Sequence, residues 1–283
     1  MKKKIRVAAA MLCVFLLGGC AMQSDQTSTE PVENVLTAEN SNEVEVEEEN
    51  VEETTVVEEA VEVEEIVEEE KEVVISLAGD CSLGKLSIHG YEGTFYEYFD
   101  NYGAAYFFRN VKWLFEEDDL TLVNFEGVLT TSEDIQEKQY NIKGEPEFKD
   151  VLKEGSIEAV SFANNHRMDY GQQGVDDTVA AFNDVNVVYA YDENLGIYET
   201  ENGLKIGIVS VNEIYEGRAV EPKLEKGIAQ LKETTDLVIV CNHWGQELQH
   251  YPNNYQKELG RKCIDWGADL VVGSHPHVLQ GID

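Results

Sequence analysis

Short apolar runs, each ended by a glycine or a polar residue, recur along the chain from residue 73 onward. Runs of this length suit strands that are buried on both faces of a sheet. The expected strands are Val73–Ala78, Leu120–Phe125, Ile157–Ala163, Lys205–Val211, Asp236–Cys241 and Leu270–Val272. The expected helices between them are Ala104–Glu117, Gly171–Asp184 and Asn253–Trp266. Alternation of strands and helices predicts an α/β fold.

Two further segments, Val187–Ala190 and Ile197–Thr200, also have the composition of strands. The second leads through the turn residues Glu201-Asn202-Gly203 into the apolar run that begins at Lys205. This spacing predicts a β-hairpin.

The first 20 residues have the pattern of a bacterial export signal. A basic start at residues 2–6 precedes the apolar run Val7–Leu17, which is too short to span a bilayer comfortably. Gly18-Gly19-Cys20 follows and resembles a lipobox, in which the cysteine is lipidated and becomes the mature N-terminus. The alternative is an ordinary secretory signal with an incidental cysteine. We expect a protein anchored by lipid to the extracytoplasmic face of a bacterial cell membrane.

Residues 21–72 are of low complexity, rich in Ser, Thr and Gln at first and then in Val and Glu. Such a composition predicts a disordered segment, either a stalk that holds a domain off the membrane or a solubilising linker. This segment carries 20 acidic residues against Lys71, and residues 1–20 carry four bases. Of the total charge of −35, residues 73–283 therefore keep −20. So acidic a surface argues against nucleic acid as a partner and favours metal cations and basic partners.

The cysteines give no sign of a disulfide framework. After Cys13 in the signal and Cys20 at the lipidation site, Cys81, Cys241 and Cys263 remain, an odd number without CxxC spacing. We expect them to be small buried apolar residues.

Metal-competent side chains follow five of the expected strands, at the edge where α/β sheets bind ligands. They are Asp80, then Asn124 and Glu126, then Asn165 and His166, then His243, and finally His275 and His277. Any one of them has a simpler explanation, as when an aspartate after a strand forms a turn. The pair of histidines around Pro276 is the strongest signal, because both rings can converge on one centre. Mixed carboxylate, amide and imidazole ligands suit Mn, Fe or Zn.

The motifs that contain these residues resemble the bacterial CapA family of the calcineurin-like metallophosphoesterase superfamily. They are Ala78-Gly79-Asp80, Asn124-Phe125-Glu126-Gly127, Ala163-Asn164-Asn165-His166 with Asp169 and Gly171, His243-Trp244-Gly245 with Glu247, and Gly273-Ser274-His275-Pro276-His277. The resemblance covers residues 73–283. It implies a layered α/β/β/α sandwich and a role in poly-γ-glutamate or capsule synthesis.

The resemblance also implies roles for single residues. Two divalent transition metals would be bound, the first by Asp80 and His277 and the second by Asn165, His243 and His275. Glu126 stands where the superfamily has a bridging carboxylate. Such a pair of metals generates hydroxide and holds the attacking and leaving oxygens of a phosphoryl group.

Four other residues are expected to support the chemistry. His166 would be the general acid or would stabilise the transition state, and Asp169 would orient it. Asn124 and Glu247 would hold the metal ligands in place. His89 and His250 lack such a context and are expected at the surface.

The chain departs from the superfamily pattern at two places. Superfamily enzymes usually begin with Asp-x-His, but Ser82 holds the position of that histidine, so the metal at Asp80 is expected to be the more weakly bound. Family members also continue beyond the last histidine, which predicts that this chain, ending at Asp283, is a fragment or has an incomplete sheet.

Three functions fit these patterns. The first is a metal-dependent hydrolase or transferase that acts outside the membrane on a phosphoester or a surface polymer. The second is a non-catalytic polymer-binding or scaffold subunit that works with surface-polymer synthesis proteins. The third, a substrate-binding lipoprotein, explains the anchor and the acidic segment but leaves the His275-Pro276-His277 cluster unexplained.

Overall fold

The computed structural model describes residues 7–8 and 71–282 of the chain. The expected lipidation site at Cys20 lies outside the described residues, as do nearly all of the export signal and the acidic segment up to residue 70. Those assignments stay predictions. Among the described residues, no helix combines the length and the apolar character needed to cross a membrane.

The first sheet is parallel throughout and has the strand order β1-β2-β4-β7-β8. Its strands are β1 (Val7–Ala8), β2 (Val73–Cys81), β4 (Leu120–Phe125), β7 (Ala159–Ser161) and β8 (Val188–Ala190). Every residue of β4 is buried, as a strand covered on both faces requires.

The second sheet has the order β12-β11-β10-β9. Its strands are β9 (Gly196–Glu199), β10 (Lys205–Asn212), β11 (Leu237–His243) and β12 (Leu270–Ser274). β10, β11 and β12 are parallel, whereas β9 runs antiparallel to β10. The predicted hairpin is therefore confirmed.

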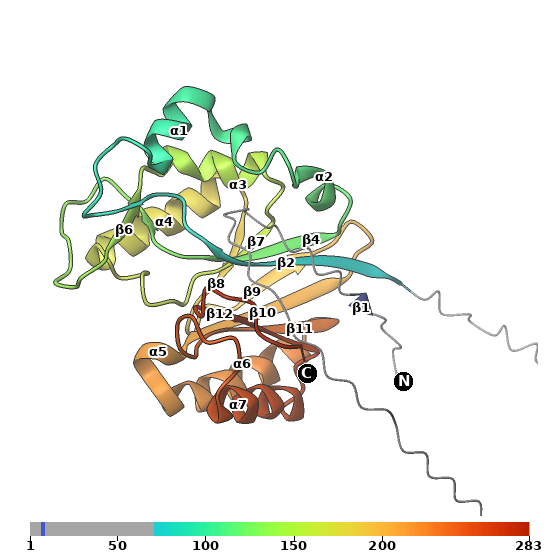
Figure 1. Cartoon of the computed structure of the whole chain (residues 1–283). Coiled ribbons are helices and arrows are strands. Elements are labelled where there is room, and N and C mark those ends of the chain that lie inside the picture. The colour runs from blue at the N-terminus through green and yellow to red at the C-terminus, as the bar shows by residue number, and fades with distance from the viewer. Residues whose placement is uncertain (1–6, 9–70, 283) are drawn as a thin grey trace, which may run out of the picture. The chain divides into compact units, whose positions relative to one another are not determined.

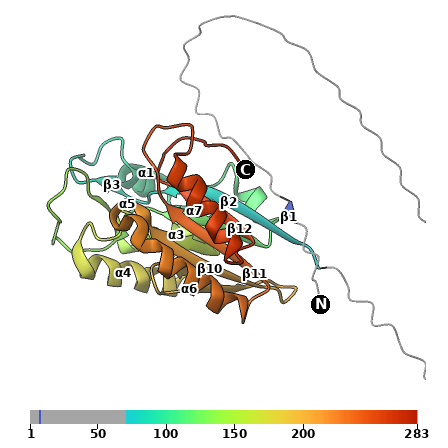
Figure 2. The same cartoon turned by 90° about the horizontal axis from the view of Figure 1, so that it is seen from below.

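Three apolar clusters show that the two sheets form the middle of a four-layer sandwich. One cluster lies between the sheets and includes Ile75 and Leu122 from the first sheet and Ile206 and Ile239 from the second. The second lies between the first sheet and the helices α1 (Phe95–Tyr102), α3 (Asp150–Glu154) and α4 (Gly171–Asp184). The third lies between the second sheet and the helices α6 (Val220–Lys232) and α7 (Asn254–Asp265). Figures 1 and 2 show the helices on the two outer sides of the sheets. The expected α/β/β/α arrangement is confirmed.

Local sequence accounts for the helices that were predicted well. α4 has the predicted bounds, and α7 begins after Asn253, whose side chain accepts a hydrogen bond from the Gln256 amide while the Gln256 side chain accepts one from Asn253 N. This capping box satisfies two amides that the first turn leaves free. Helix α6 was not predicted, although its buried residues Val220, Leu224, Ile228 and Leu231 repeat at helical spacing.

The predicted helix over Ala104–Glu117 is wrong. The segment forms a short 3-10 helix, η1 (Ala104–Tyr106), a turn, and the four-residue α2 (Lys112–Phe115). Its aromatic residues do not form one face of a helix. Phe107, for example, stacks on Phe95 with ring centroids 4.0 Å apart. Tertiary packing of the aromatic rings therefore overrides the local spacing.

The remaining elements are short. A third, small sheet has the strand order β3-β6-β5. Its strands are β3 (Lys85–Leu86), which follows β2 in the chain, β5 (Val128–Leu129), which follows β4, and β6 (Ile142–Gly144). η2 (Pro146–Lys149) precedes α3, while α5 (Glu213–Glu216) and η3 (Gly217–Ala219) lead from β10 into α6.

Candidate metal centre

An irregularity in β2 directs Asp80 toward the second sheet. Leu77 pairs with Leu122 and Asp80 with Asn124, so β2 carries one residue more than β4 between these pairs, and such a bulge re-aims side chains. The Asp80 carboxylate accepts a hydrogen bond from Asn124 Nδ2 at 2.8 Å. It also accepts from the main-chain amide of His275, 3.3 Å from both carboxylate oxygens. Asp80 thus joins the end of β2 to the residue that follows β12.

Asp80 and His277 form an ion pair, with His277 Nδ1 2.8 Å from Asp80 Oδ2. Burial opposes the charged form of Asp80, but hydrogen bonds from His277 and Asn124 outweigh it and lower the pKa of Asp80. The hydrogen bond with Asp80 raises the pKa of His277. Both shifts favour the charged forms, a carboxylate beside an imidazolium.

Glu126 follows β4 and is only 2% exposed. Its Oε2 atom has no hydrogen-bond partner among the described residues, although buried carboxylate oxygens normally have one. Burial, together with the charge of Asp80, raises the pKa of Glu126 to about 8. One ligand atom each from Asp80, Glu126 and His277 lies within 4.8 Å of the others, as a shared cation requires.

His243, the last residue of β11, is fully buried and paired with Asn165. Its Nε2 atom lies 2.9 Å from Asn165 Oδ1, and its Nδ1 atom lies 3.0 Å from Ser274 Oγ. The amide oxygen only accepts, so Nε2 carries the proton and Nδ1 accepts from the serine. Burial, followed by the neighbouring His275, lowers the pKa of His243 to about 3. This imidazole is neutral and can bind a metal.

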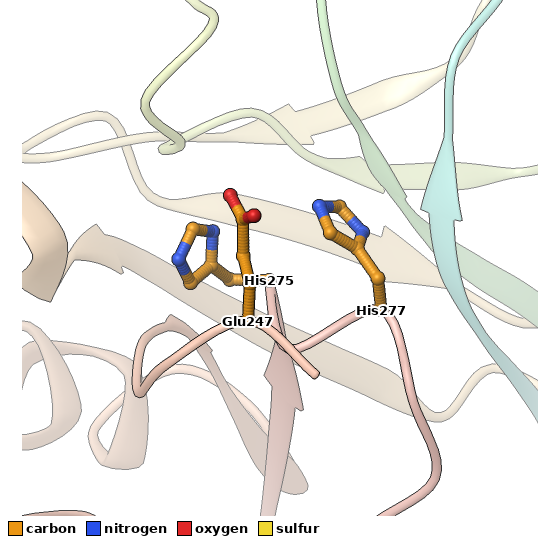
Figure 3. A group of neighbouring side chains, drawn as sticks. All are labelled: Glu247, His275 and His277. Carbon is orange, nitrogen blue, oxygen red and sulfur yellow. The ribbon is translucent and has the colours of Figure 1, made fainter. Parts of the chain in front are cut away.

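The turn after β12 presents His275 and His277 to the site (Figure 3). Both residues have positive φ angles, 91° and 54°, a conformation that side chains avoid and that is often found at functional sites. Burial lowers the pKa of His275, and its Nδ1 atom is buried without a partner among the described residues. Glu247 lies beside both rings, and ligand atoms of the three residues lie within 4.8 Å of one another. The structure therefore places Glu247 among the candidate ligands.

His166 lies next to these candidate ligands, and Asp169 contacts its ring on the side opposite Glu126. His166 Nδ1 is 2.8 Å from Asp169 Oδ2, while His166 Nε2 is 3.7 Å from Glu126 Oε1. The main chain at His166 is fixed as well, because its amide donates to Asn164 Oδ1 at 3.0 Å. His166 and Asp169 are thus in hydrogen-bond contact, and the orienting role expected of Asp169 stays a prediction.

A cavity of about 330 Å³ opens onto these side chains. Its lining residues are Asp80, Ser82, Leu86, Glu126, Tyr140, Ile142, His166, Glu247 and His277. The lining thus combines polar candidate ligands with the larger side chains of Leu86, Tyr140 and Ile142. The cavity has room for a substrate beside the candidate ligands.

The structure brings the residues singled out from the sequence to one place, and it leaves His89 and His250 exposed as expected. Sequence reasoning missed two features. Glu247 was expected only to support the ligands, yet it lies among them. Lys138, in the loop between β5 and β6, contacts Asp169 and the Asn165 main chain, and nothing in its local sequence indicates this.

The donor set fits divalent transition metals. Glu126 Oε2 and His275 Nδ1 are buried polar atoms without a partner among the described residues, and a cation would satisfy both. Carboxylate oxygens with neutral imidazoles are ligands of Mn, Fe and Zn, and the thiols are unsuitable because burial raises the pKa of Cys81 and Cys241 to about 12.

Comparison with known families gives a match over nearly all of the residues that the structure describes. Residues 74–283 match the family described as bacterial capsule synthesis protein PGA_cap. The chain is 28% identical over 239 residues to the capsule biosynthesis protein CapA of Bacillus anthracis, covering 75% of this chain and 56% of that protein. It is 32% identical over 202 residues to the PGA biosynthesis protein CapA of Bacillus subtilis, covering 64% of this chain and 53% of that protein. The chain thus spans a little over half the length of these two relatives.

Proposed function

The chain belongs to the bacterial capsule synthesis protein family PGA_cap, and we propose that it acts in surface-polymer synthesis through a dinuclear metal centre of the phosphoesterase type. The observation that carries the proposal is the set of carboxylate and imidazole groups that meet at the ends of β2, β4, β11 and β12. This set leaves Glu126 Oε2 and His275 Nδ1 without protein partners among the described residues. A buried polar atom without a partner is costly, and an unseen ion is one explanation for it.

The ligands divide into two groups that share Glu126. Asp80 and His277 would hold one metal, while Asn165, His243 and His275 would hold the other. When bound, such a pair of metals supplies a hydroxide nucleophile at neutral pH and stabilises the charge on a phosphoryl group. Glu247 adds an oxygen close to His275 and His277.

The protein's own groups position the proton transfer. A carboxylate only accepts hydrogen bonds, so the 2.8 Å contact with Asp169 puts a proton on His166 Nδ1. His166 lines the cavity, and its Nε2 atom is the one free to exchange a proton with a leaving oxygen there. Asn124 keeps the Asp80 carboxylate in place through the 2.8 Å hydrogen bond.

The location that we propose is the outer face of the bacterial cell membrane. The export signal in residues 1–20, the lipobox that ends at Cys20 and the acidic residues 21–72 support it. Surface-polymer synthesis proteins would be its partners, and an anionic polymer or a phosphoester its substrate. Because residues 73–283 carry a net charge of −20, such a substrate would be attracted only where bound metals reverse the local potential.

One observation favours a second function, that of a non-catalytic polymer-binding or scaffold subunit. Ser82 lines the cavity at the position where superfamily enzymes usually have a histidine. A metal beside Asp80 would therefore have one imidazole fewer and weaker occupancy. A domain with one metal and no turnover would still bind a polymer.

The proposal is tested on the full chain by elemental analysis for Mn, Fe and Zn and by assays with bis(p-nitrophenyl) phosphate and p-nitrophenyl phosphate. We expect bound metal, metal-dependent turnover, and loss of metal in the double variant His275→Ala/His277→Ala. His166→Ala should keep the metal and lower kcat by about 100-fold or more.

The outcomes separate the two functions. Metal at background level in the wild type, or equal metal in the double-histidine variant, would contradict the metal centre. Bound metal with no turnover above that of His166→Ala would support the scaffold function instead. His250→Ala, which changes an exposed histidine outside the site, is the matched control and should leave both metal and turnover unchanged.

A further inference from the structure

Lys138 reaches across from the loop between β5 and β6 to the segment that carries Asn165 and His166. Its Nζ atom lies 2.5 Å from Asp169 Oδ1 and donates to the Asn165 main-chain oxygen at 2.8 Å. The same atom is 3.3 Å from His166 Nδ1. The Lys138 ammonium group therefore contacts Asn165, His166 and Asp169, none of which is close to Lys138 in sequence.

Asp169 needs this cation because its side chain is fully buried. Its Oδ2 atom accepts hydrogen bonds from Ile142 N at 2.6 Å and from His166 Nδ1 at 2.8 Å. The ion pair with Lys138 supplies the opposite charge at Oδ1. A buried carboxylate that lost such a partner would carry a large desolvation penalty and would tend to rotate or take up a proton.

The two contacts at His166 Nδ1 determine which nitrogen carries the proton. The carboxylate can only accept and is closer, at 2.8 Å, than the ammonium, which can only donate. Nδ1 therefore carries hydrogen, and Nε2 is left for the cavity. If Asp169 rotated or became protonated, Nδ1 could instead accept from a donor, and the proton would move to Nε2.

We propose that Lys138 is a positioning residue of the site, which fixes the tautomer and orientation of His166 by holding the Asp169 carboxylate and the Asn165 main chain. The inference rests on the proposed function for its kinetic consequence but not for its structural one. Asn165 keeps its contact with His243 and a hydrogen bond from Tyr215 to its main-chain oxygen, so metal binding should not depend on Lys138.

The kinetic test compares Lys138→Met, which removes the charge at similar length, with Lys138→Arg, which keeps it. In Lys138→Met we expect kcat for bis(p-nitrophenyl) phosphate to fall by about 10- to 100-fold, with KM and metal content unchanged. Lys138→Arg should recover most of the loss. Lys143→Met is the matched control, because Lys143 lies in the neighbouring strand β6 and pairs with the exposed Glu133, and it should leave kcat unchanged.

A double-mutant cycle tests whether Lys138 acts through Asp169. Asp169→Asn combined with Lys138→Met should lose no more activity than the more damaging single change, since the two groups work as a unit. Multiplied losses, or a Lys138→Met variant as active as Lys143→Met, would overturn the inference.

A direct measurement keeps the inference testable even if the wild type shows no turnover, an outcome that would count against the proposed function alone. Two-bond ¹H–¹⁵N correlation spectra of the histidine-labelled full chain report the tautomer, with His166→Gln used to assign the signal. We expect a single Nδ1–H tautomer for His166 in the wild type and a mixture in Lys138→Met. The same tautomer in both proteins would overturn the inference.

Discussion

The site contains two close pairs of candidate ligands that differ in charge and in exposure. In one, the neutral His243 lies 2.9 Å from Asn165 Oδ1 and is fully buried. In the other, an imidazolium at His277 lies 2.8 Å from Asp80 Oδ2, and 40% of the His277 side chain is exposed. Two atoms that share one metal at about 2.1 Å are themselves roughly 3 Å apart, so both pairs have the spacing of ligands.

The two pairs differ in whether they must release a proton before a metal can bind. The neutral pair can accept a cation after a change of tautomer, with Ser274 adjusting its hydroxyl, and releases no proton. The charged pair must first lose the imidazolium proton, because metal ligands bind in their deprotonated form. The buried pair should therefore determine the affinity for the metal at Asn165 and His243, and the exposed pair the pH dependence of the metal at Asp80 and His277.

The largest expected effect is on metal affinity and separates the two pairs directly. His243→Gln should weaken the binding of Mn²⁺ by at least about 100-fold, more than the loss of an outer partner costs, whereas His277→Gln should cost about 10-fold. Calorimetric titration of the chelator-treated chain measures both. Equal losses, or the larger loss in His277→Gln, would show that the pairs do not differ as described.

Glu126, the proposed carboxylate between the two metals, is expected to destabilise the metal-free protein at high pH. Its folded pKa of about 8 is above the ordinary value of 4.5, so the folded state retains a proton that the unfolded state loses, and stability falls as pH rises between these values. Glu126→Gln should therefore stabilise the metal-free protein at pH 9 by on the order of 2 kcal/mol and change little at pH 4. Thermal unfolding at both pH values measures this. Glu225→Gln, an exposed residue of α6, is the control, and an equal shift in both variants would refute the explanation.

The number of protons released on metal binding should differ between the two metals by about one, and the pH dependence of their affinities should differ accordingly. Binding of either metal depends on deprotonation of Glu126, but only the metal at Asp80 and His277 displaces the proton that Asp80 holds on His277 through its raised pKa. Below that pKa, affinity for this metal should gain about one extra factor of ten per pH unit. Titrations between pH 5.5 and 7.5 give the two slopes, and His277→Gln should make them equal. Equal slopes in the wild type would contradict the assignment of the proton.

The smallest expected effect concerns an acid outside the site. Burial raises the pKa of Glu158 to about 7, while its Oε2 atom accepts from Thr121 N at 2.7 Å. Stability is again lost as pH rises from about 4.5 to 7, so Glu158→Gln should stabilise the protein at pH 8 by about 1 kcal/mol after solvent screening, and hardly at pH 4. Unlike the Glu126 effect, this one should persist when metal is bound. Its disappearance on adding metal would link Glu158 to the site.

Sequence reasoning succeeded where a local pattern and burial agree. The run Leu120–Phe125 is apolar except at Thr121 and Asn124, and it forms a strand with the predicted bounds because both of its faces are covered. Over Ala104–Glu117 the same reasoning failed, since Phe107 packs against Phe95 and Phe99, which lie outside the segment. Aromatic residues at helical spacing can be buried on one face of a helix or by residues distant in the chain. The spacing alone does not distinguish the two.

The sequence by itself determined the α/β order of elements and the identity of the polar residues that end the strands, because strand and turn preferences are local. Tertiary structure alone decided which of those residues meet: His277 with Asp80, His243 with Asn165, and Glu247 with His275. It also placed Lys138 against Asp169, across 31 positions of the chain. These contacts depend on sheet register, loop path and side-chain charge acting together over distances that no local pattern encodes.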